Sequence, residues 1–176
     1  NAAVVYAGDL IAGGGFDQAG GAQANSVARF DGTDWLPLGA GVSSGVLSLA
    51  VLGNDLFAGG NFMQAGGAPA SFVARWDGSD WSPMGSGTNN TVHSVSVYAG
   101  ALIAGGSFTQ AGGNLANHIA RWNGSAWSTL GSGVNGRVRA LAVYNGALIA
   151  GGSFSQAGGA SASNIARWDG FTWQPL

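Results

Sequence analysis

The 176-residue sequence contains no cysteine, no lysine and no glutamate, and only 8% of its residues are charged. Without cysteine the chain has no disulfide framework, no thiol nucleophile and no zinc site with thiolate ligands. All six basic residues are arginine, all eight acidic residues are aspartate, and the net charge is −2. This charge argues against a basic nucleic-acid-binding surface and against a polybasic membrane anchor.

Long apolar runs and helix-forming residues are also scarce. The longest uninterrupted apolar run covers residues 2–7, far short of the roughly 20 residues that a membrane-spanning helix needs. Glycine supplies 33 residues, and glycine is a poor helix former. These glycines follow no three-residue period and there are only four prolines, so a collagen helix is excluded as well.

The sequence instead contains one motif repeated four times. Each copy opens on a leucine, 46 residues after the previous one: Leu10, Leu56, Leu102 and Leu148. The pattern of apolar runs and turn residues predicts four short strands in each unit, with two-residue hairpin turns such as Asn145-Gly146 after the first strand. Proline follows the start of the fourth strand in three units, which indicates an outer edge because proline lacks an N–H donor. The units are expected over residues 1–38, 46–84, 92–130 and 138–176.

A four-stranded antiparallel unit of this length, repeated in tandem, is typical of a propeller blade. One blade cannot bury both of its faces, whereas blades stacked around an axis can. The sequence therefore predicts an all-β fold, a β-propeller of four four-stranded blades. These blades form a single domain or half of an eight-bladed ring. An open β-solenoid is the rival architecture, but it lacks paired hairpin turns.

The repeated motif resembles the kelch repeat over the whole chain. The resemblance rests on apolar residues before a double glycine, an aromatic residue in the third strand, and Trp five residues later. The double glycines are Gly13-Gly14, Gly59-Gly60, Gly105-Gly106 and Gly151-Gly152. The aromatic residues are Phe30, Trp76, Trp122 and Trp168. This chain departs from the kelch pattern in a QAGG insert and in carrying Trp or Phe where kelch repeats usually carry Tyr.

The kelch resemblance implies a propeller fold and leaves the function open, because kelch-like propellers serve as binding modules, scaffolds and occasionally oxidases. Kelch-like oxidases need a copper site with Tyr, His and a cross-linked Cys. This chain has no Cys, so an oxidase domain would be present only without its metal site. We expect no enzymatic activity, no catalytic residue, no metal and no cofactor.

Two sets of residues recur for structural reasons. Tryptophans at the start of the fourth strand are expected to fill the seams between blades, with carbohydrate stacking as the alternative: Trp35, Trp81, Trp127 and Trp173. Arginines stand two residues before an Asp or Asn in the last turn: Arg29, Arg75, Arg121 and Arg167. We expect each arginine to fix the turn of its own blade through that side chain. A ring of four arginines lining an anion site is the alternative.

Binding residues favour long loops on a rigid scaffold. The connectors at residues 42–47, 88–93 and 134–139 are expected to share one face with the long second loops, whereas the other face carries tight turns. The candidate ligand face comprises Ser43, Ser44, Asn89, Asn90, His93, Asn135, Arg137 and Arg139, with Asp17, Met63 and Thr109 at the start of the loops. An ordinary solvated loop surface is the alternative.

Two classes of function remain open on the sequence. One is a non-catalytic binding scaffold that recognises a protein or a glycan, located extracellularly or at the cell surface. The other is a structural unit that assembles a ring or an array. Small residues at strand and loop positions suit closely stacked blades. We therefore expect a homodimer that completes an eight-bladed ring, with a compact four-bladed monomer and a fragment of a longer chain as alternatives. No nucleic-acid partner and no membrane association are expected.

Overall fold

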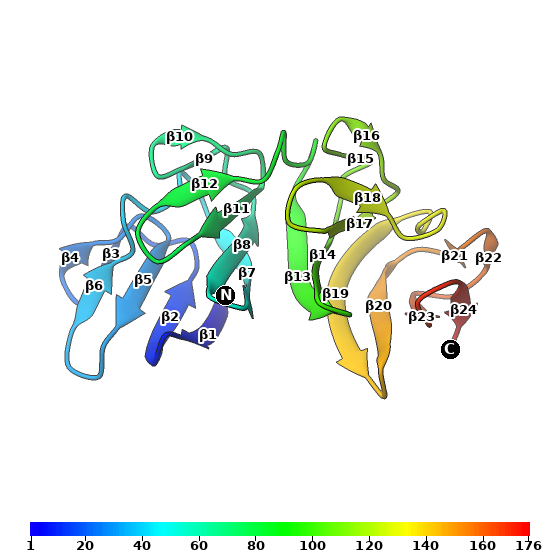
Figure 1. Ribbon diagram of the computed structural model, residues 1–176, viewed down its shortest axis with the longest axis horizontal. Coiled ribbons are helices and arrows are strands. Elements are labelled where there is room, and N and C mark those ends of the chain that lie inside the picture. Colours follow the sequence, from blue (N-terminus) through cyan, green and yellow to red (C-terminus); the bar gives the residue numbers. More distant parts are fainter.

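The computed structural model describes residues 1–176 and contains β-strands but no helix. The strands form four four-stranded antiparallel sheets that follow one another along the chain as blades (Figure 1). In each blade the first strand lies innermost and the fourth strand forms the outer edge. The predicted all-β fold of four repeated blades is therefore confirmed. No helix that is long and apolar enough to cross a membrane is present.

Each blade has the same strand order. The first blade comprises β1 (Ala2–Tyr6), β2 (Asp9–Gly13), β5 (Val27–Phe30) and β6 (Trp35–Pro37). The second comprises β7 (Val46–Leu52), β8 (Asp55–Gly60), β11 (Val73–Trp76) and β12 (Trp81–Pro83). The third comprises β13 (Val92–Tyr98), β14 (Ala101–Gly106), β17 (Ile119–Trp122) and β18 (Trp127–Thr129). The fourth comprises β19 (Arg137–Tyr144), β20 (Ala147–Ser153), β23 (Ile165–Trp168) and β24 (Trp173–Pro175).

The predicted hairpin turns are present between the first and second strands. Asn145 and Gly146 have φ angles of 48° and 72°, the two positive values that a type I′ turn requires. Each long second loop also contains a small hairpin that we did not predict. These hairpins are β3 (Gln18–Ala19) with β4 (Ala22–Gln23), β9 (Gln64–Ala65) with β10 (Ala68–Pro69), β15 (Gln110–Ala111) with β16 (Asn114–Leu115), and β21 (Gln156–Ala157) with β22 (Ala160–Ser161). The double glycine of the QAGG insert forms the turn, with φ angles of 61° and 80° at Gly112 and Gly113.

Consecutive blades meet at seams that repeat the same contacts. At the first seam, Ile11 and Val27 of one blade pack against Leu56, Phe62 and Trp76 of the next. The fourth-strand tryptophan of each later blade donates its indole N–H to a carbonyl of the preceding blade: Trp81 to Leu38 at 2.9 Å, Trp127 to Met84 at 2.8 Å and Trp173 to Leu130 at 2.9 Å. These three tryptophans are each 6% exposed, so they lie within the seams and present little ring surface for carbohydrate stacking.

The four blades form an open arc in the single chain (Figure 1). Innermost strand β7 packs between β1 and β13, and β13 packs between β7 and β19. Strands β19 and β1, by contrast, are not among the pairs that pack closely together. The single chain thus has three seams and two blade faces with no neighbour.

The recurring arginines do not fix the last turn, contrary to our expectation. Arg29 Nη1 lies 3.2 Å from Asp9 Oδ2, and Arg75 Nε lies 2.8 Å from Asp55 Oδ2. Both aspartates begin the second strand and are diagonal cross-strand neighbours of the arginine. In the third and fourth blades Ala101 and Ala147 stand at the equivalent position of the second strand.

Without that carboxylate, Arg121 is exposed and makes no ion pair, and Arg167 donates to Gln174 at 3.0 Å. Each recurring arginine lies on the third strand of a different blade, outside the innermost strands. The four guanidinium groups therefore do not form the alternative anion-binding ring.

The carboxylates of the turn aspartates instead accept hydrogen bonds from main-chain amides. Asp77 Oδ1 accepts hydrogen bonds from Ser79 N and Asp80 N, both at 2.9 Å. The N–H of Asp80, followed by that of Ser79, lowers the pKa of Asp77 below its ordinary value, and the same bonds lower the pKa of Asp31 and Asp169. In the third blade Asn123 Oδ1 makes the equivalent bonds with a neutral amide, at 3.0 and 2.9 Å.

We expect these turns to make the fold less stable in acid. A carboxylate whose pKa is lowered by folding stabilises the native state above its unfolded pKa, here 3.8, and loses that contribution as the pH falls toward the folded pKa. We expect the melting temperature to drop as the pH falls below about 4. Replacing Asp31, Asp77 and Asp169 together by Asn should flatten this dependence, because the amide oxygen accepts the same bonds at any pH. Thermal unfolding of both proteins from pH 7 to pH 3 is the measurement, and superimposable pH profiles would refute this origin.

Candidate functional site: the long-loop face

The connectors between blades and the long second loops lie at the same end of the propeller, which we call the long-loop face. Each connector forms a bridge with the small hairpin of the next blade, pairing Val42 with Ala65, Thr88 with Ala111 and Val134 with Ala157. The connector also receives main-chain bonds from the blade behind it, as where Val42 N donates to Asn25 O at 2.9 Å. The loops of neighbouring blades are therefore held together as one rigid surface.

Three of the predicted ligand residues act as clamps in this surface. Asn89 Oδ1 accepts bonds from Thr109 N at 2.9 Å and Gln110 N at 3.0 Å, and its Nδ2 donates to Thr109 Oγ1 at 3.1 Å. Asn135 makes the same three contacts in the next seam. Ser43 Oγ accepts the corresponding two amide bonds in the first seam, from Met63 N at 3.1 Å and Gln64 N at 3.0 Å. These side chains join one blade to the loop of the next.

We expect Asn89→Ala to lower the free energy of unfolding by about 1–2 kcal/mol, because two loop amides lose their acceptor. Asn89→Ser should cost less, since the serine hydroxyl of Ser43 already makes the two amide bonds at the first seam. Denaturant unfolding of both variants is the measurement. Equal losses for alanine and serine would show that the amide bonds do not carry the effect.

Four of the other predicted residues are not clamps. Ser44, Met63 and Asp17 are exposed around the first seam, and the side chain of Ser44 makes no hydrogen bond within the chain. Asn90 closes its own connector, with Oδ1 accepting from Thr91 N at 2.7 Å and its carbonyl accepting from Thr88 Oγ1 at 2.8 Å. The predicted residues therefore share one face but are spread over three seams and do not converge on one site.

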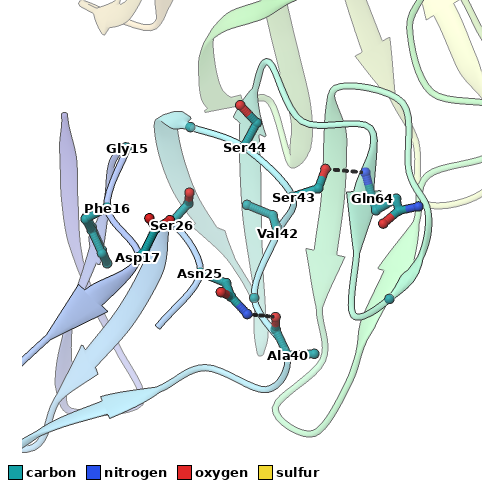
Figure 2. Close-up of a pocket in the computed structure, with 13 residues that line it drawn as sticks. Gly15, Phe16, Asp17, Asn25, Ser26, Ala40, Val42, Ser43, Ser44 and Gln64 are labelled. Atoms are coloured by element: carbon teal, nitrogen blue, oxygen red, sulfur yellow. Dashed lines mark hydrogen bonds between the residues drawn. The ribbon is translucent and has the colours of Figure 1, made fainter. Parts of the chain in front are cut away.

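A polar cleft opens at the first seam, between the long loop of the first blade and the connector that follows it (Figure 2). It encloses about 480 Å³, and its polar lining includes the predicted residues Asp17, Ser43 and Ser44 together with Asn25, Ser26 and Gln64, which we did not predict. Asn25 Nδ2 donates to Ala40 O at 3.0 Å, which holds the wall of the cleft in place. An equivalent cleft of about 310 Å³ lies at the third seam, with Asn117 and Gln156 at the corresponding positions.

Basic side chains gather at the inner rim of this face, near the start of β13 and β19. His93 and Arg139 occupy the β-bulges of these strands. His93 Nε2 lies 2.8 Å from Ser107 Oγ, and Arg139 Nε donates to Ser153 Oγ at 3.1 Å. Burial lowers the pKa of His93, and the nearby charges of Arg137 and Arg139 lower it further.

His118, which we did not predict, joins this group from the long loop of the third blade. Burial lowers the pKa of His118 as well, and the charge of Arg137 adds to that effect against the opposing influence of the Gly106 carbonyl. Asp17 is the only carboxylate among the long loops and connectors, because the other seven aspartates lie at or beside the tight turns. The two ends of the propeller thus differ in charge.

Four blades, repeated seams and a loop face of this kind define the chain as a β-propeller repeat protein. A family described as "Domain of unknown function (DUF5122) beta-propeller" matches residues 100–125. A search of curated proteins gave no match. Among solved structures, the chain is similar to the computationally designed Ika8 protein, with a TM-score of 0.61 and 17% sequence identity. The match covers 99% of this chain and 46% of that one, so the chain spans about half the length of the designed protein.

Proposed function

We propose that the protein is a non-catalytic, kelch-like β-propeller scaffold that works outside the cell and binds a glycan on its long-loop face. The observation that carries the proposal is the cleft at the first seam, whose hydrogen-bonding walls are held in place by the bonds of Ser43 and Asn25. Glycan hydroxyl groups both donate and accept hydrogen bonds, and this cleft is lined by a carboxylate, two side-chain amides and three serine hydroxyls. Low overall charge supports recognition by hydrogen bonding rather than by net charge.

Rigidity is the second support for a binding role. A ligand that meets a preformed site does not have to order the loops that contact it, and this saves affinity that would otherwise be lost. The connector beside the cleft is fixed on both sides, by the Val42–Ala65 bridge and by the bond from Asn25 to Ala40. Ser44 is exposed within this fixed frame and its side chain makes no hydrogen bond, so it is the natural position at which to block the cleft.

A glycan array probed with the 176-residue protein tests this function. We expect the wild-type protein to bind a subset of the glycans, and Ser44→Trp to lose that binding because the indole fills the cleft without removing a clamp. Thr33→Trp is the matched control, since it places the same side chain on an exposed tight turn at the other end of the propeller. An array on which the folded wild-type protein binds nothing, or binding that survives Ser44→Trp, contradicts the proposal.

A further inference from the structure

The two ends of the arc expose the positions that are buried at the three seams inside it. On the last blade, Leu176 is 66% exposed and Ile165 is 39% exposed. The residues equivalent to Leu176 are 4%, 1% and 3% exposed: Leu38, Met84 and Leu130. The residues equivalent to Ile165 are fully buried: Val27, Val73 and Ile119. The free face of the last blade is thus one half of a seam.

The free face of the first blade is the other half. Leu10 is 39% exposed there, whereas its equivalents are fully buried at a seam: Leu56, Leu102 and Leu148. Val5 is 65% exposed; its equivalents Val51 and Val97 pack into seams, whereas the third equivalent, Val143, is 47% exposed. Each end of the chain therefore exposes one half of a seam. Equivalent halves already pack together at the three seams inside the molecule.

An apolar hollow on the last blade shows what is missing. It encloses about 570 Å³ and is lined by Tyr144, Ile149 and Leu176. The same positions of the third blade, Tyr98, Ile103 and Leu130, face Trp168 of the following blade across a smaller space of about 330 Å³. The residue equivalent to Trp168 in the first blade is Phe30, which stands half-buried on the free face there.

The indole of Trp35, on the same face as Phe30, is the second group that lacks the neighbour its equivalents have. Its three equivalents donate their indole N–H to a carbonyl of the preceding blade, and the accepting residues are Leu38, Met84 and Leu130. Trp35 has no preceding blade in the chain and lies half-buried beside Phe30, with 5.2 Å between the ring centroids. Leu176 stands at the repeat position of these three accepting residues, and it lies on the free face at the opposite end of the chain.

We propose that a second copy of this chain closes the arc, head to tail, into an eight-bladed ring. Phe30 of each copy enters the hollow between Tyr144, Ile149 and Leu176 of the other, and Trp35 donates to the main-chain carbonyl of Leu176. The interface is heterologous and forms twice, which closes the assembly by twofold symmetry. It also covers two apolar blade faces whose exposure would promote association without limit. This assembly does not depend on the proposed glycan site.

Ring closure predicts a single species of twice the 17.4 kDa chain mass in sedimentation velocity at micromolar concentration. Leu10→Asp and Ile165→Asp each place a charge in both new seams, and both variants should sediment as monomers with an unchanged circular dichroism spectrum. Both positions are already partly exposed in the single chain, so the charge remains solvated in the monomer. Leu115→Asp is the control, because Leu115 is 66% exposed at a loop tip away from the seams, and it should remain a dimer.

Mixing the two monomeric variants distinguishes head-to-tail pairing from the pairing of like faces. The mixed pair has one seam free of substitutions, so a species of dimer mass should reappear. Dimerisation through two first-blade faces would instead leave Ile165→Asp dimeric. That result, a monomeric wild-type protein, or a ladder of larger polymers would overturn the proposed ring.

Discussion

Replacing Trp127 by alanine is expected to lower the free energy of unfolding by about 3–5 kcal/mol, as for other large aromatic side chains removed from a packed core. Trp127 is 6% exposed and packs against Trp122 with 5.3 Å between the ring centroids. The substitution empties the seam between the second and third blades, and it leaves the Met84 carbonyl without its donor at 2.8 Å. Both losses fall at the same contact between blades.

Trp127→Phe separates these two contributions. Phenylalanine retains an aromatic ring in the seam but has no indole N–H, so this variant should lose about 1–3 kcal/mol, the cost of an unpaired buried acceptor. Urea unfolding followed by circular dichroism is the measurement for both variants. A loss below about 1 kcal/mol for Trp127→Ala would mean that the seams do not hold the blades together.

Gly106→Ala is expected to have the second largest effect, a loss of about 3 kcal/mol, the upper range for overpacking a close contact. The Cβ added at Gly106 would overlap the main-chain carbonyl oxygen of Thr91 in the connector, and a carbonyl held in the connector cannot rotate away as a side chain can. The φ angle of Gly106 is not in the positive range, so the cost comes from lack of space and not from backbone strain.

Gly14→Ala is the matched control at the same repeat position of the first blade. No carbonyl oxygen is among the atoms nearest to the added Cβ at Gly14, which are in the Phe16 ring, at 3.0 and 3.2 Å. The equivalent ring, that of Phe108, also lies near the Cβ position at Gly106, so the Thr91 carbonyl is the difference between the two sites. Thermal unfolding should show a change within about 1 kcal/mol for Gly14→Ala, and equal losses at the two glycines would contradict the steric explanation.

Much of the fold follows from the sequence, because its signals are local and are repeated four times. Turn dipeptides such as Asn145-Gly146, and the prolines after the fourth-strand tryptophans, place the strands and the outer edge. The small hairpins were missed because two-residue strands carry no alternation. Their signal was available in the double glycine at Gly112-Gly113, which has the two positive φ angles of a hairpin turn.

The candidate site was less accessible from the sequence. Asn89 and Asn135 were expected to be free for a ligand, but they bond to the loop of the next blade, about 20 residues away. The arginine partners were missed for a related reason. The turn aspartate two residues along the chain is the nearer candidate partner in sequence, but its carboxylate already accepts hydrogen bonds from main-chain amides. The arginine pairs instead with Asp9 or Asp55 on the neighbouring strand. Contacts across strands and seams require the fold to be known first.

Proton exchange at the indole of Trp35 reports whether the two ends of the chain are halves of one seam. Trp81, Trp127 and Trp173 donate their indole N–H across seams within the chain, and these protons should exchange slowly in any folded form. If the ring closes, the Trp35 indole is as protected as these three in the wild-type protein and exchanges rapidly in the Leu10→Asp variant. Rapid exchange at Trp35 in the wild-type protein, with the other three protected, would contradict ring closure.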